Sequence, residues 1–105
     1  MRTLTSRLIA TGFAIGSGIH MLGFALLLID VEWYGPGYPA WRHATMATID
    51  LGIALTATFR PSWLLVVLPV FIAERLLFHG FGWTPVAAAL GFFLFLWERH
   101  RGKLQ

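Results

Sequence analysis

The chain alternates between long apolar runs and short segments rich in polar residues, glycine or proline. From four apolar runs we predict helices over residues 8–29, 42–59, 62–79 and 83–98, with an outer loop over residues 30–41. An α-helix needs about 20 mostly apolar residues to cross a bilayer core. The first run has this length, and the others approach it with their flanking residues. The pattern therefore predicts an all-α integral membrane four-helix bundle, with residues 1–105 forming a single transmembrane domain.

Glycine and proline mark the predicted boundaries. Gly35, Pro36, Gly37 and Pro39 interrupt any helix between the first two runs. Pro61 lacks a backbone N–H group and has a fixed φ angle, which suits the first turn of the third helix. These breaks divide the apolar sequence into separate helices.

Composition supports the same class of protein. The chain is 57% hydrophobic and 12% charged, whereas soluble domains are about 45–50% apolar and about 25% charged. A soluble fold of this length could not bury so much apolar surface. A soluble enzyme and a disordered segment are therefore disfavoured. The chain has no cysteine, which excludes disulfides, thiolate metal ligands and cysteine catalysis.

Positive charge is distributed unevenly between the two sides of such a bundle. One side would hold six of the eight Lys and Arg residues: Arg2, Arg7, Arg60, Arg99, Arg101 and Lys103. The opposite side would hold Arg42, and Arg75 lies inside a span. Because positive residues concentrate on the cytoplasmic side, we predict that both termini are cytoplasmic. We expect a bacterial cytoplasmic (inner) membrane, contact with the lipid bilayer and no nucleic-acid partner. We also expect the first run to be a span and not a cleaved signal peptide.

Two helical faces are expected to point into the protein. In the first helix Gly12, Gly16, His20 and Gly23 share one face, and glycines at this spacing let helices approach closely. The second helix has a similar face, formed by His43, Ala47, Asp50, Ala54 and Ala57. Small residues on the first and fourth helices leave surface for further contacts. We therefore expect a homo-oligomer or a subunit of a larger membrane complex.

Ionisable residues inside the spans are the candidates for function. We predict a proton or ligand pocket formed by Asp50, Glu74, Arg75 and His20, because charged groups are costly within a membrane unless they are paired or functional. If all face inward and Arg75 neutralises one carboxylate, the other must be protonated, bind a cation or pair with protonated His20. The alternative for Asp50 is a structural ion pair with Arg75. The predicted rim, at the outer edge, contains His43, His79, Trp33, Tyr34 and Trp41.

Cofactors and catalytic residues are not fixed by any motif. A metal held by His20, Asp50 and Glu74, a haem on His43 and His79, and a chlorin pigment on His20 stay open as alternatives. The chain length and the four predicted spans resemble the small multidrug resistance transporters. That family has an essential glutamate in its first helix, where this chain has only His20, so its function is not inferred here.

Three classes of function follow from these residues. The first is a polar pocket, open to the outer face, that handles protons, a cation or a small molecule. The second is a non-catalytic accessory subunit in which the charges fix the helix register. The third is a small membrane enzyme that performs acid–base chemistry on a lipid or terpenoid, where aromatic residues could stabilise a cation.

Overall fold

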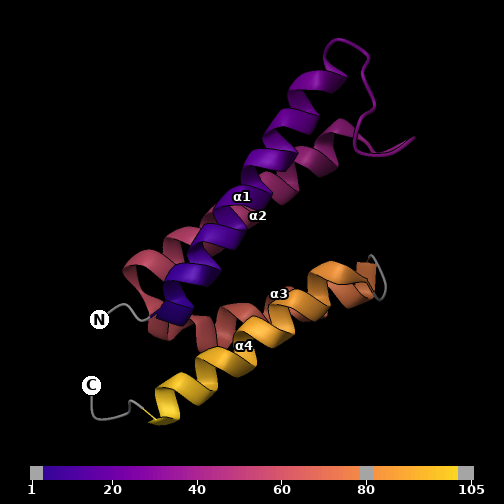
Figure 1. Ribbon diagram of the computed structural model, residues 1–105. Coiled ribbons are helices and arrows are strands. Elements are labelled where there is room, and N and C mark those ends of the chain that lie inside the picture. The colour runs from indigo at the N-terminus through magenta and orange to yellow at the C-terminus, as the bar shows by residue number, and fades with distance from the viewer. Residues whose placement is uncertain (1–3, 79–81, 102–105) are drawn as a thin grey trace.

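The computed structural model describes residues 4–78 and 82–101 (Figure 1). These residues form four α-helices and one short 3-10 helix, without any β-strand in the described ranges, which confirms the predicted all-α class. The elements are α1 (Leu4–Leu27), α2 (Ala40–Phe59), η1 (Pro61–Trp63), α3 (Leu64–Phe78) and α4 (Trp83–Arg101). Each lies within a few residues of its predicted range. The largest shifts are at the start of α1, which begins earlier than expected, and at the end of α4, which is longer.

Two helical segments are long and apolar enough to cross a membrane, Leu4–Leu27 and Pro61–Phe78. Sequence analysis predicts four such spans. Helix α2 is less apolar because it carries Arg42, His43 and Asp50, and α4 is less apolar because its last turn contains Arg99, His100 and Arg101. Length and composition therefore identify two candidate spans among the four helices.

The helices form two antiparallel hairpins that diverge from one end (Figure 1). Helices α1 and α2 pack along most of their lengths, α3 packs mainly on α4, and contacts between the two hairpins are fewer. The start of α1 lies near the end of α4, where the Thr5 backbone N–H group donates to Glu98 Oε1 at 3.3 Å. From that end the two hairpins separate toward the end of α1.

The turn between α2 and α3 joins the hairpins. The Arg60 N–H group donates to the Thr56 carbonyl at 2.8 Å, and Pro61 begins η1, as its lack of an N–H group predicts. Buried apolar residues from all four helices meet where the hairpins contact each other: Ile9, Ile53, Ala57, Leu64, Leu68, Phe71, Ala88 and Phe95. Phe13 adds an edge-to-face contact with Phe71, at 5.0 Å between ring centroids. This core closes one end of the molecule and leaves the hairpins apart at the other.

Candidate functional site

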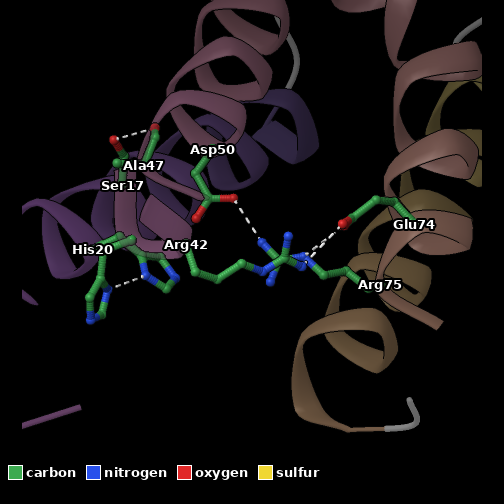
Figure 2. Close-up of polar contacts among 8 residues, drawn as sticks. Ser17, His20, Arg42, Ala47, Asp50, Glu74 and Arg75 are labelled. Carbon is green, nitrogen blue, oxygen red and sulfur yellow. Dashed lines mark hydrogen bonds and ion pairs between the residues drawn. The ribbon is translucent and has the colours of Figure 1, made fainter. Parts of the chain in front are cut away.

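The predicted inward face of α2 is confirmed. His43, Ala47, Asp50, Ala54 and Ala57 are all buried. They face α1, where Ser17 donates to the Ala47 carbonyl at 2.8 Å (Figure 2). Because residues spaced by three and four positions share one face of a helix, the sequence pattern was sufficient to identify this surface.

Two of the three glycines on the predicted contact face of α1 lie against side chains of α2. A Cβ atom added at Gly16 would lie 2.8 Å from Asp50 Oδ2, and one added at Gly23 would overlap the imidazole ring of His43. Gly12 is different, because a Cβ atom there would meet nothing within 4 Å. The prediction that Gly12 packs against another helix is therefore wrong for this chain alone. Gly12 borders the space between the hairpins, so α1 does not closely approach the hairpin of α3 and α4 at this position.

Four charged side chains connect α2 to α3 across the gap between the hairpins (Figure 2). Arg75 Nη2 lies 3.5 Å from Asp50 Oδ1, and Arg75 Nε lies 3.5 Å from Glu74 Oε1. Arg42 Nη2 donates to Glu74 Oε2 at 3.2 Å. The order Asp50, Arg75, Glu74, Arg42 alternates in sign, so the formal charges of the row sum to zero.

The role of Arg42 was not found in the sequence. We expected Arg42 on the outer side, apart from the pocket, and a surplus carboxylate at Asp50 or Glu74. The structure instead places Arg42 on Glu74, so each carboxylate has a guanidinium partner. One signal was present in the sequence. Arg42 begins the second helix and Glu74 lies near the end of the third, and an antiparallel arrangement brings these two positions to a similar depth.

Asp50 is buried but poorly satisfied. It is 5% exposed, and its ion pair with Arg75 is long. Asp50 Oδ1, Glu74 Oε1 and Arg75 Nε form no hydrogen bond with any described residue. Arg75 is 6% exposed, and its guanidinium lies 4.6 Å from the ring centroid of Phe71. Buried polar groups normally have hydrogen-bond partners, so these three atoms indicate a place where a further polar group can bind.

A second polar cluster joins α1 to α2 beside this row. His20 Nδ1 and His43 Nδ1 are 3.0 Å apart, so one of them donates a hydrogen bond and the other accepts it. Tyr34 and Tyr38 pack against both imidazoles, with ring centroids 4.5–6.0 Å apart. Burial raises the pKa of the Tyr38 hydroxyl, and the nearby Tyr34 raises it further, while Arg42 lowers it. The pKa stays above its ordinary value, so this phenol is protonated at neutral pH.

The residues of the predicted rim occupy different surroundings in the structure. His43, expected at a solvated outer edge, is 1% exposed because Gly23 and the two tyrosines enclose its ring. Tyr34 borders the space between the hairpins, whereas Trp33 and Trp41 are exposed and do not border it. His79 lies outside the described residues. Trp83, which the enzyme alternative also places at the rim, lines this space.

The space between the hairpins is a cleft of about 490 Å³. Its walls are mostly apolar and come from α1 and α4, with small residues on both sides: Gly12 and Gly16 on α1, and Ala87, Ala88 and Gly91 on α4. Its polar lining is limited to Thr5 and Thr84 and to one group formed by His20, Tyr34, Asp50 and Arg75. Ligand pockets generally have this character, with volumes of about 300–1,000 Å³, apolar walls and a few converging polar groups.

Comparisons of the chain with protein-family models, curated proteins and solved structures found no match.

The metal alternative is not supported by the geometry of the described residues. His20, Asp50 and Glu74 do not come together, and no group of three or more His, Asp or Glu residues in the described ranges could hold a metal ion. His20 contacts His43, while the carboxylates of Asp50 and Glu74 contact arginines. The arrangement is better suited to hydrogen bonding of a small molecule than to coordination of a metal.

Proposed function

We propose that this chain is an integral membrane protein with four spans and cytoplasmic termini, and that its cleft binds a small amphiphilic molecule from the membrane. The apolar exterior supports the membrane location. Large hydrophobic side chains are exposed on all four helices, including Leu22, Leu55, Val66 and Phe93. In water this surface would be unfavourable, but it is suited to contact with lipid.

The observation that carries the proposal is the position of Asp50 and Arg75. Both are at least nine-tenths buried, both line the cleft, and each carries an atom without a hydrogen-bond partner among the described residues. The rest of the cleft is mainly apolar. A molecule with one polar group and an apolar body would satisfy both parts of this surface.

The ion pairs distinguish this proposal from handling of cations. A cation site needs a carboxylate with spare negative charge, whereas the two carboxylates here are matched by Arg75 and Arg42. A cation between them would have to displace a guanidinium. Binding of a small molecule requires no such displacement, and it is therefore the function that this geometry supports best.

The four-span topology predicts which loop positions face the cytoplasm. The chain has no cysteine, so single substitutions such as Gly35→Cys and Ser62→Cys introduce unique reactive sites. In intact cells a membrane-impermeant maleimide should label Gly35→Cys strongly and Ser62→Cys only after the membrane is permeabilised. Ser62 is exposed in η1, just before α3, so burial in the fold does not prevent labelling. Equal labelling of both variants in intact cells would contradict the topology.

Filling the cleft should abolish binding. Gly12 borders the cleft and has open space beside it, so Gly12→Leu should place an apolar side chain where the ligand lies. The probe is a long-chain alkyl diazirine alcohol in proteoliposomes, cross-linked by light and mapped by peptide mass spectrometry. We expect saturable labelling of α1 and α4 to fall about tenfold or more, which corresponds to a loss of at least about 1.4 kcal/mol in binding free energy.

Gly18→Leu is the matched control for this experiment. Gly18 is also on α1 with open space around it, but it does not line the cleft. This variant should label as the unmodified protein does. If Gly12→Leu and Gly18→Leu label equally, or if labelling does not saturate in the unmodified protein, the cleft is not a binding site.

A further inference from the structure

The electrostatics of the cleft restrict the charge of its occupant. Asp50 and Glu74 are balanced by Arg75 and Arg42, so the row of four side chains is neutral when all are ionised. A charged head group beside this row would leave one charge without compensation in surroundings of low dielectric constant, which is unfavourable. A neutral head group preserves the balance.

The depth of the polar group leads to the same conclusion. Gly16 is near the middle of α1, and Asp50, which lies against Gly16, is near the middle of α2. In the proposed topology these residues lie near the centre of the membrane. A lipid head group must leave the interface to reach them, and this step is far less costly for a neutral group than for a charged one.

The unsatisfied atoms restrict the head group further. The Asp50 carboxylate can only accept hydrogen bonds, and the Arg75 guanidinium can only donate them. Neither Asp50 Oδ1 nor Arg75 Nε has a hydrogen-bond partner among the described residues. A hydroxyl group can donate to the carboxylate and accept from the guanidinium at once. A ketone or quinone oxygen can only accept, so it would leave Asp50 unsatisfied.

The shape of the cleft indicates the apolar body of the occupant. Along α1 its lining extends from Thr5 to His20, which corresponds to about 22 Å at 1.5 Å per residue. A volume of about 490 Å³ spread over this length makes the cleft narrow. The small residues Gly12, Ala87 and Gly91 line it beyond the polar group. An extended chain fits this space better than a fused ring system.

We infer that the cleft binds a neutral, single-chain lipid alcohol of the alkyl or isoprenoid class, with its hydroxyl group between Asp50 and Arg75. This inference rests on the proposed binding function of the cleft, and it adds the chemical class of the ligand. The body of the lipid lies along the small-residue walls of α1 and α4.

A matched series of photoreactive lipids tests this inference. One alkyl diazirine chain is prepared with a hydroxyl, a ketone, a carboxylate or a trimethylammonium head group, and labelling of α1 and α4 is measured against concentration in proteoliposomes. We expect the alcohol to reach half-saturation at about tenfold lower concentration than the ketone, the scale of one hydrogen bond to a charged group. The charged lipids should need a concentration at least as high as the ketone, because each adds an uncompensated charge.

The variant Asp50→Asn should change the preference of the cleft among these lipid head groups in a defined direction. The variant removes one negative charge, so Arg75 is left with excess positive charge and labelling by the carboxylate lipid should rise relative to the alcohol. The side-chain amide of Asn can also donate a hydrogen bond, so the alcohol should lose its advantage over the ketone. Asp30→Asn is the matched control, because Asp30 is exposed in the loop after α1 and does not line the cleft. It should leave the preference unchanged.

The outcomes separate the inference from the proposed function. One contrary result is that all four lipids label the unmodified protein saturably with equal affinity, and another is that the carboxylate lipid labels it best. Either result would support a binding cleft but overturn the assignment of an alcohol as its ligand. Absence of saturable labelling by every lipid overturns both. Oxidative disulfide formation between two copies of a Gly12→Cys variant, without any lipid adduct on the unmodified protein, would assign the cleft to a second copy and also overturn the inference. If Asp50→Asn does not fold, the comparison of lipids on the unmodified protein still decides the question.

Discussion

Replacing Arg75 with methionine is expected to lower the free energy of unfolding by about 3–5 kcal/mol, the cost of removing one partner of a buried ion pair. Methionine retains much of the length and the apolar stem of arginine. What is lost is the guanidinium that lies between Asp50 and Glu74. Asp50 is 5% exposed and its Oδ1 atom receives no hydrogen bond from any described residue, so the carboxylate would remain as an uncompensated buried charge.

The measurement is reversible denaturation in detergent micelles, followed by circular dichroism. Arg99→Met is the control, because Arg99 is exposed near the end of α4 and its loss should cost less than about 1 kcal/mol. Adding Asp50→Asn to Arg75→Met removes the unpaired charge and leaves Arg42 to balance Glu74, so the double variant should recover more than half of the loss. A double variant no more stable than Arg75→Met would show that Asp50 and Arg75 do not stabilise each other.

The buried faces of α1 and α2 could be predicted because helical periodicity is a local property of the sequence. His20, Gly23, Asp50 and Ala54 are separated by intervals that place them on the facing sides of the two helices, and all four are buried as expected. The helix ends were also predictable to within a few residues, since proline and charged residues limit the apolar runs. These features require no knowledge of how one hairpin sits against the other.

The relation between the hairpins could not be predicted, because it depends on contacts between residues far apart in the chain. The divergence of the hairpins leaves Gly12 beside an open cleft, where its spacing suggested a helix contact. The long side chain of Arg42 crosses the same gap to reach Glu74. The burial of His43 depends on the fold of the loop after α1, which brings Tyr34 and Tyr38 over its ring. None of these arrangements has a periodic signal.

Reversing the charge of Glu74 should destabilise the protein, and a second reversal at Arg42 should restore it. Glu74→Arg would place another cation beside Arg42 and Arg75, with Asp50 as the remaining counter-charge. Repulsion replaces attraction at 3.2 Å and 3.5 Å, and the side chains of Glu74 and Arg42 are only 25% and 15% exposed. At an effective dielectric constant of about 20, we expect the free energy of unfolding to fall by about 2–4 kcal/mol.

The double variant Glu74→Arg with Arg42→Glu has the same composition as the original chain and restores the neutral row. We expect it to recover at least half of the loss seen in Glu74→Arg, as measured by the same denaturation experiment, while Arg42→Glu alone should be as damaging as Glu74→Arg. Arg60→Glu combined with Glu74→Arg is the control, because Arg60 is exposed at the turn between α2 and α3 and has no ion pair among the described residues. It restores the net charge of the chain without restoring the pair.

Equal recovery by the two double variants would mean that total charge, and not the contact between Arg42 and Glu74, determines stability. Recovery confined to the Arg42 variant would identify this contact as a link between the two hairpins on the side of Asp50 away from the turn between α2 and α3.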